Sequence, residues 1–280
     1  MKLKKIITCL LPMLLTAVMA FSGPASSLHV SVTGKGARTV ILIPGFTCSG
    51  KVWDATVKQL SPAYTCHVIT FAGFAGEPAV AEPHLKDWVA DIAAYITEQR
   101  LNKPVVIGHS IGGGMAMMLA AAHPELISKI VVVDALPCLS AAQNPSFKAD
   151  PGADCTPFID RYTAMNDSML YAMQSKTVPM LCADTAMHAQ ILGWSMQSDR
   201  RTMGRIYCEF LNTDLRQTIS GINCPALIML EAPFKTYDAA MQQQYAALKD
   251  KQIVYAGKGL HFIMYDDKDW YLQQLNTYLR

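Results

Sequence analysis

Short hydrophobic runs separated by amphipathic stretches recur along most of the chain. Residues 28–33 alternate between apolar and polar side chains, whereas the later runs are continuous and rich in Val and Ile. These runs lie at residues 39–43, 67–71, 105–107, 130–133, 226–230 and 253–255. Continuous β-branched runs are typical of parallel strands buried on both faces. We therefore expect these segments to form a mostly parallel sheet.

Stretches with helical periodicity lie between the expected strands. They cover residues 52–60, 85–99, 111–122, 241–248 and 270–279. An alternation of strands and helices of this kind predicts an α/β fold that is doubly wound around its sheet.

The alternation stops between the runs at 130–133 and 226–230, in a segment rich in Met, Ala, Asp and Gln. We expect a helical cap at residues 137–221, inserted into one core made of residues 28–136 and 222–280. Methionines recur in the cap at helical spacing, at Met165, Met169 and Met173. Packing of the cap onto the core is the favoured role of these side chains, and thioethers also suit a wall that faces an apolar substrate.

The N-terminus has the composition of a secretory signal. Three lysines among the first five residues precede an apolar run at residues 6–20, which contains a proline and is short for a membrane span. Small residues end the run at Ala20, and Ala25 is a second candidate for the last residue removed. We expect residues 1–20 to be a signal peptide and the mature protein to be periplasmic or secreted, without a stable membrane anchor.

The amino-acid composition and net charge indicate which kinds of molecule the protein binds. The chain has 280 residues, of which 51% are hydrophobic and 16% charged, with a formal net charge of +2. Loss of the three signal lysines lowers the basic count from 24 to 21 against 22 acidic residues, a net charge near −1. This composition excludes a disordered chain, and no basic tract with interleaved aromatic residues suggests a nucleic-acid partner. We expect a small-molecule substrate.

The strongest chemical motif is the sequence G-H-S-I-G at residues 108–112. It follows an expected strand and precedes an expected helix, which is the context required of a G-x-S-x-G nucleophile elbow. The glycines allow a tight turn, and the turn exposes Ser110 at a helix N-terminus, where developing negative charge is favoured. Ser110 is therefore the predicted nucleophile.

Two further segments, taken together with this motif, resemble a known family. I-P-G-F at residues 43–46 follows an early strand, and G-L-H-F at residues 259–262 follows the last one. With the elbow, they resemble the α/β-hydrolase superfamily, specifically its single-domain, cap-bearing serine esterase-like members, over residues 28–280. The resemblance implies the chain order serine, acid, histidine, with His261 as the general base.

The resemblance also implies an oxyanion hole made of two backbone N–H groups, those of Ile111 after the serine and Phe46 in the early loop. Pro44 stands where many relatives carry a histidine that braces this loop. The backbone donor is unaffected by this departure. Thr47 and Ser49 are candidates to supply the missing support.

The acid is the residue that the motifs leave open. The G-x-x-D sequence usual in the superfamily is missing after residues 226–230, where Phe234 stands near the usual aspartate. Asp134 ends the preceding strand, and some members of the superfamily take their acid from this position. Asp134 is the favoured acid, and Glu231 and Asp238 remain alternatives.

These residues predict an exported serine hydrolase that cleaves a small or medium apolar ester through an acyl-enzyme on Ser110. No cofactor or metal is expected, because the sequence has no Gly-rich phosphate loop, no CxxC pair and no HExxH helix. Thioesterase, amidase, aminopeptidase or C–C hydrolase activity on the same triad remains an alternative, and so does a non-catalytic ligand-binding protein with a hydrolase fold.

Seven of the eight cysteines lie beyond the expected signal, and four of them lie in the cap. In an exported protein, disulfides would staple a cap that has no sheet to support it. A pair such as Cys138–Cys155 or Cys182–Cys208 would serve this purpose, which is a hypothesis at this point. With an odd number of cysteines, at least one stays unpaired within the monomer.

Overall fold

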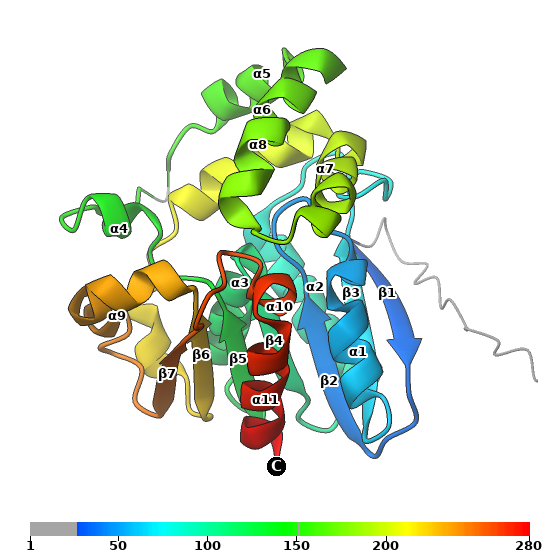
Figure 1. Cartoon of the computed structure of the whole chain (residues 1–280), viewed down its shortest axis with the longest axis vertical. Helices are drawn as coiled ribbons and strands as arrows, with labels where there is room; N and C mark the ends of the chain where they lie inside the picture. Colours follow the sequence, from blue (N-terminus) through cyan, green and yellow to red (C-terminus); the bar gives the residue numbers. More distant parts are fainter. Residues whose placement is uncertain (1–26, 151) are drawn as a thin grey trace, which may run out of the picture.

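The computed structural model describes residues 27–150 and 152–280. A sheet with helices on both faces forms the core, and a group of helices lies above it (Figure 1). The expected signal peptide, with both candidate cleavage positions, lies outside the described residues. Within those residues, no helix combines the length and hydropathy needed to cross a membrane.

The sheet has seven strands in the order β1-β3-β2-β4-β5-β6-β7. β1 runs antiparallel to β3, and every other pair of neighbours is parallel. The strands are β1 (Leu28–Thr33), β2 (Arg38–Ile43), β3 (Tyr64–Phe71), β4 (Val105–His109), β5 (Lys129–Val133), β6 (Ala226–Leu230) and β7 (Lys251–Tyr255). The prediction of a doubly wound α/β fold with a mostly parallel sheet is confirmed.

Helices cover both faces of the sheet, which explains why the strand sequences are continuously apolar. In β2, Ile41 and Ile43 belong to the cluster that contains α2 and α3, whereas Val40 and Leu42 belong to the cluster that contains α1 and α11. The helices around the sheet are α1 (Asp54–Leu60), α2 (Leu85–Glu98), α3 (Ile111–Ala122), α9 (Asp238–Gln244), α10 (Ile263–Asp266) and α11 (Lys268–Leu279), with the 3₁₀ turns η1 (Gly50–Trp53), η3 (Thr218–Gly221) and η4 (Ala232–Tyr237).

Two of the expected helices differ most from the structure, one in the type of its first turn and the other by more than two residues at each end. The segment expected as one helix at 52–60 begins as the 3₁₀ turn η1 and continues as α1. The helix expected at 241–248 is α9, which begins earlier and ends at Gln244. η4, with a proline in its first turn, leads directly into α9 and sets its start.

A helical group lies between β5 and β6, where the described residues contain no strand. It consists of α4 (Ser140–Gln143), α5 (Thr156–Thr163), α6 (Asp167–Leu181), η2 (Thr185–Met187), α7 (His188–Gln197) and α8 (Arg200–Leu211). We call α5–α8 the cap. It lies over the end of the sheet at which the parallel strands terminate (Figure 1).

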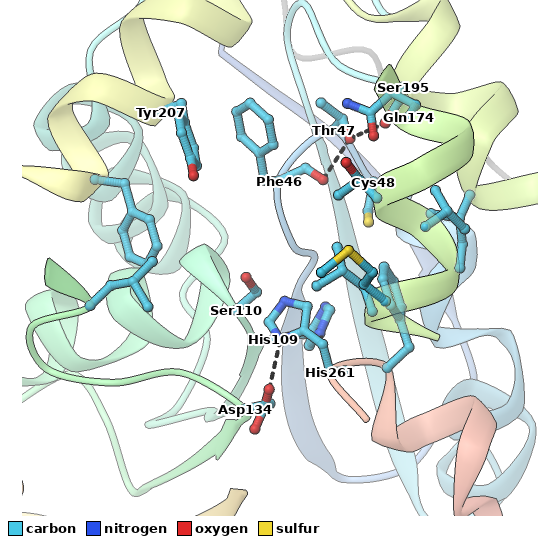
Figure 2. A pocket seen from close by; sticks show the side chains of 18 of the residues that line it. Phe46, Thr47, Cys48, His109, Ser110, Asp134, Gln174, Ser195, Tyr207 and His261 are labelled. Carbon is cyan, nitrogen blue, oxygen red and sulfur yellow. Dashed lines mark hydrogen bonds and ion pairs between the residues drawn. The ribbon is translucent and has the colours of Figure 1, made fainter. Parts of the chain in front are cut away.

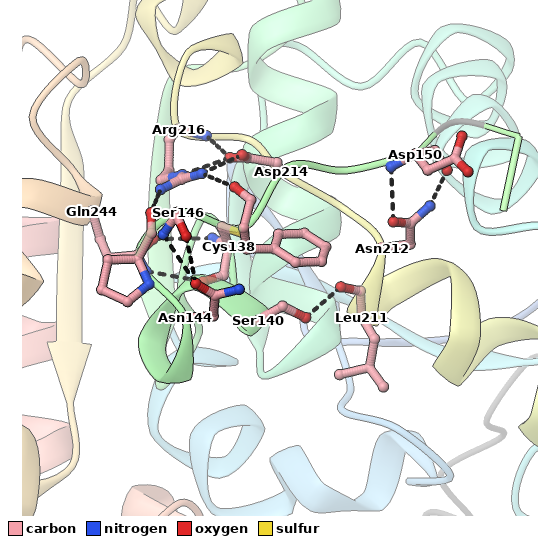
Figure 3. Close-up of polar contacts among 12 residues, drawn as sticks. Cys138, Ser140, Asn144, Ser146, Asp150, Leu211, Asn212, Asp214, Arg216 and Gln244 are labelled. Carbon is pink, nitrogen blue, oxygen red and sulfur yellow. Dashed lines mark hydrogen bonds and ion pairs between the residues drawn. The ribbon is translucent and has the colours of Figure 1, made fainter.

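The chain leaves the core for the cap and returns to it through two segments that are hydrogen-bonded to each other (Figure 3). The Arg216 guanidinium donates to the main-chain carbonyls of Pro145 and Phe147, at 3.2 and 2.8 Å. The Asp150 N–H donates to the side-chain oxygen of Asn212 at 2.9 Å. These bonds close the base of the cap.

One disulfide joins the N-cap residue of α5 to α8, and it is not one of the expected pairs. It connects Cys155 with Cys208, whose Cα atoms are 5.7 Å apart. Both expected pairings are therefore wrong, and Cys138 and Cys182 are buried free thiols. Packing of α5 against α8 brings the bonded cysteines together, whereas Cys138 contacts α9 and Cys182 contacts α10.

Candidate active site

The turn from β4 into α3 holds Ser110 in an unusual backbone conformation. Its φ of 56° and ψ of −126° are rare for a residue with a side chain. A Cβ at Gly108 would collide with the Gly112 carbonyl, and one at Gly112 would collide with the carbonyls that end β2. The Ser110 N–H donates to the Val133 carbonyl of β5 at 2.9 Å. Glycines on both sides are thus a steric requirement of this turn.

Asp134 and His261 form a hydrogen-bonded pair in which the carboxylate is buried and the imidazole is partly exposed. Asp134 follows β5, with a φ of 47°, and its Oδ2 lies 2.6 Å from His261 Nδ1. The Asp134 side chain is 3% exposed and that of His261 22%. Figure 2 shows Ser110 beside the imidazole, and both line the cavity. The structure therefore brings Ser110, His261 and Asp134 to one site.

The two other candidate acids are not hydrogen-bonded to His261. Glu231 donates its main-chain N–H to Asp134 Oδ1 at 2.7 Å, and its side chain lines the cavity. Burial, reinforced by the nearby Asp134 carboxylate, raises the pKa of Glu231 to about 7. Asp238 is exposed and accepts a hydrogen bond from the Tyr255 hydroxyl at 2.6 Å. Of the three carboxylates, Asp134 is the one hydrogen-bonded to His261.

His109 precedes Ser110 and packs against His261, with ring centroids 4.7 Å apart. Its Nε2 lies 3.0 Å from the His261 main-chain oxygen, so this nitrogen carries the proton and donates. Burial is the main cause that lowers the pKa of His109 well below its usual value, which keeps the ring neutral. His109 therefore serves as a neutral hydrogen-bond donor to the His261 carbonyl.

The two predicted oxyanion donors come from the elbow itself and from the loop after β2. Ile111 is the first residue of α3, and its N–H has no acceptor within the helix. Phe46 lies in the loop after β2, whose turn is closed by a hydrogen bond from the Cys48 N–H to the Gly45 carbonyl at 3.1 Å. The Phe46 N–H is not part of that bond. Phe46 also lines the cavity.

Thr47 links this loop to the cap. The Thr47 hydroxyl donates to the Phe46 carbonyl at 2.7 Å and contacts the Ser195 hydroxyl of α7 at 2.8 Å. Ser49 instead accepts from the Lys51 N–H and caps η1. Of the two residues considered as supports for the loop, Thr47 makes the contact to the neighbouring helix.

The cavity has a volume of about 570 Å³ and lies between the cap and the strand ends. Much of its wall is apolar and comes from the cap, with Phe158, Tyr162, Met173, Val178, Leu181 and Ile191 among its residues. Of the three methionines at helical spacing, Met173 lines the cavity and Met169 is 53% exposed. Met165 packs against the buried hydrophobic cluster that joins cap residues to α2 and α3. In the described part of the chain, no group of three His, Cys, Asp or Glu side chains is placed to hold a metal ion.

The chain belongs to the alpha/beta hydrolase family, whose sequence model matches residues 40–274. Among similar solved structures, an enol-lactonase from Burkholderia xenovorans is 17% identical, with a TM-score of 0.73 over 90% of this chain and 96% of that one. An esterase from Exiguobacterium antarcticum is 18% identical, with a TM-score of 0.72 over 90% and 94%. A thermophilic esterase from Thermogutta terrifontis is 16% identical, with a TM-score of 0.75 over 90% and 93%. These likenesses establish a hydrolase fold.

Proposed function

We propose that this protein is an exported serine hydrolase that cleaves small or medium apolar esters through an acyl-enzyme on Ser110. The observation that carries the proposal is the arrangement of Ser110 on its strained turn beside His261, with Asp134 Oδ2 2.6 Å from the far nitrogen of the imidazole. A nucleophile, a base and a group that orients the base are the minimum set for acyl transfer.

Asp134 fixes the proton of His261 on Nδ1, which leaves Nε2 as the base. Nε2 takes the Ser110 proton as Oγ attacks the ester carbonyl, and the N–H groups of Phe46 and Ile111 stabilise the oxyanion. The protonated imidazole then gives its proton to the departing alcohol. A water molecule, deprotonated by His261, attacks the acyl-enzyme, releases the acid and restores Ser110.

The size and lining of the cavity support the substrate class. A volume of about 570 Å³ suits a small or medium ligand, and apolar cap side chains would cover its hydrocarbon part. Neither reaction step requires a cofactor.

The nucleophile is tested with a fluorophosphonate probe and p-nitrophenyl esters. Ser110→Ala is expected to lose labelling and to lower kcat by about 10⁶-fold, because no other residue replaces the attacking oxygen. Ser220→Ala, which changes an exposed serine in η3, is the matched control. If wild type and Ser110→Ala label equally or not at all, the protein is a ligand-binding member of the family and the hydrolase proposal fails.

The scissile bond is tested by comparing acyl esters with matched thioesters and amides. The proposal expects the esters to have the highest kcat/KM, with a maximum at one short or medium chain length. Negligible hydrolysis of all esters, together with turnover of a thioester or amide, would show that the enzyme is a thioesterase or amidase instead.

Export is tested by fractionation and intact mass. We expect the mature protein outside the cytoplasm, with its N-terminus directly after Ala20 or Ala25. Deletion of residues 1–20 is expected to retain the protein in the cytoplasm. Recovery of the full-length chain from the cytoplasmic fraction would contradict this part of the proposal.

A further inference from the structure

One face of α6 carries a polar residue where the pattern calls for an apolar one. The side chains at this face recur at helical spacing, at Leu170, Met173, Gln174, Thr177, Val178 and Leu181. All but Leu170 line the cavity. Thr177 donates its hydroxyl to the Met173 carbonyl at 3.1 Å, which leaves Gln174 as the polar exception on this face.

Gln174 is buried, with 9% of its surface exposed, and it lines the cavity. Its amide makes no hydrogen bond to any residue in the described ranges. The residue as a whole is buried, but its amide atoms keep accessible surface, which they share with the cavity. Polar groups in such a setting are almost always paired with protein, water or ligand. The cavity is therefore where the partner of this amide would lie.

The surroundings of Gln174 indicate what that partner is. In Figure 2, Gln174 lies beside Thr47 and Ser195 at the cap side of the cavity, while Ser110 and His261 lie at the opposite side. The Thr47 and Ser195 hydroxyls are paired with each other, and neither is charged. A neutral amide both donates and accepts, so it suits a hydroxyl or carbonyl oxygen.

We propose that Gln174 determines substrate specificity by hydrogen bonding to a neutral oxygen group on the ester chain, remote from the scissile bond. The substrate class is then a hydroxy- or oxo-substituted aliphatic ester. This inference rests on the proposed function for the position of the ester at Ser110. A site built to hydrogen-bond a substrate group discriminates strongly against analogues that lack it, because its own polar group is then left unpaired.

Binding to the inactive Ser110→Ala variant tests the inference without catalysis. Methyl esters from butanoate to octanoate are compared with their ω-hydroxy and ω-carboxylate counterparts by calorimetry. At one chain length, the ω-hydroxy ester is expected to bind about tenfold more tightly than the plain ester. Adding Gln174→Leu removes that preference and tightens binding of the plain ester.

Gln174→Asn gives a readout that a merely structural residue would not produce. It withdraws the amide by one methylene, so the preferred ω-hydroxy ester should become one methylene longer. Ser175→Ala, on the same helix but outside the cavity lining, is expected to leave the preference unchanged.

Equal binding of plain and ω-hydroxy esters at every length would overturn the inference, as would an unchanged preference in Gln174→Leu. Tighter binding of the ω-carboxylate ester would overturn the neutral class. A failure of the proposed serine mechanism would be distinguishable from a failure of this inference. If Ser110 is not a nucleophile, the wild type is not labelled by the fluorophosphonate, whereas the ratio of ω-hydroxy to plain ester affinity is unaffected.

Discussion

Asp134 uses both oxygens of one carboxylate, one toward His261 and one toward the main chain of Glu231. The second bond fixes the rotation of the carboxylate, so the first is held in line with the imidazole. Glu231 is adjacent but contributes only its N–H to this arrangement. The side chains of the two acids therefore have separable effects on catalysis and stability.

Asp134→Asn is expected to lower kcat/KM by about 10³- to 10⁴-fold, because the Glu231 N–H retains the amide oxygen and the NH2 group then faces Nδ1, which favours the wrong tautomer of His261. Glu231→Gln keeps the N–H donor to Asp134 and is expected to lose less than about tenfold. Steady-state hydrolysis of the preferred ester checks both values. Near-wild-type turnover in Asp134→Asn, with a large loss in Glu231→Gln, would show that Glu231 and not Asp134 is the acid of the triad.

Glu231 also makes stability depend on pH. Its pKa is raised from 4.5 to about 7 in the fold, so its stabilising contribution is complete below pH 4.5 and is lost as the pH rises through about 7. Glu231→Gln should be more stable than wild type by about 1–2 kcal/mol near pH 8. Urea denaturation between about pH 4 and pH 8 measures the difference, which should vanish at the acid end. A difference independent of pH would contradict this interpretation.

The sequence could predict Ser110 and His261 because each lies in a local motif with a defined strand or helix beside it. The acid could not be settled in this way. Whether Asp134 or Glu231 faces the imidazole depends on the register of β5 against β6, which no local pattern encodes. Gln174 was missed, although a glutamine within an apolar helical stripe was visible in the sequence.

For the cap helices, too, the sequence predicts the type of element but not which elements contact each other. The absence of strands in the cap follows from its composition, but the pairing of its cysteines depends on which helices pack together. α5 and α8 are distant in sequence and adjacent in space, so spacing alone favoured the wrong pairs. The strands, in contrast, lie within their expected runs or extend them by a few residues, because their burial on both faces leaves a clear signal.

Replacement of both Cys155 and Cys208 by alanine is expected to lower the free energy of unfolding by about 2–4 kcal/mol, because the disulfide closes a loop with a sequence separation of 53 residues. Urea denaturation with and without reductant measures the loss. Reductant should destabilise the wild type and leave the double variant unchanged. Equal stability of the oxidised wild type and the variant would contradict the assignment of a stabilising role.

At the scale of the whole molecule, the cap is joined to the loop that carries His261. The Leu181 carbonyl at the end of α6 accepts the Phe262 N–H at 3.0 Å. Asp266 of α10 accepts the N–H groups of Ala183 and Asp184 through one oxygen and that of Leu260 through the other, each at 2.9 Å. The position of the base thus depends on the cap.

Asp266→Ala is expected to lower kcat by about 10- to 100-fold with a smaller change in KM, because a small displacement of the base costs more than a change in the cavity wall. Hydrogen exchange should become faster at residues 181–184 and 260–262. Asp269→Ala, at an exposed position in α11, is the matched control. An unchanged kcat with faster exchange would show that the contact serves stability alone.

The closed base of the cap has a consequence for protein engineering. Since β5 and β6 are neighbours and the two connecting segments are hydrogen-bonded side by side, a cap could be exchanged between family members without altering the sheet. A transplanted cap would keep the fold but replace residues 181–184, whose main-chain groups are positioned to bond to Asp266 and Phe262. Such chimaeras should be soluble but show a loss of kcat like that of Asp266→Ala, unless residues 181–184 of this chain are kept in the graft.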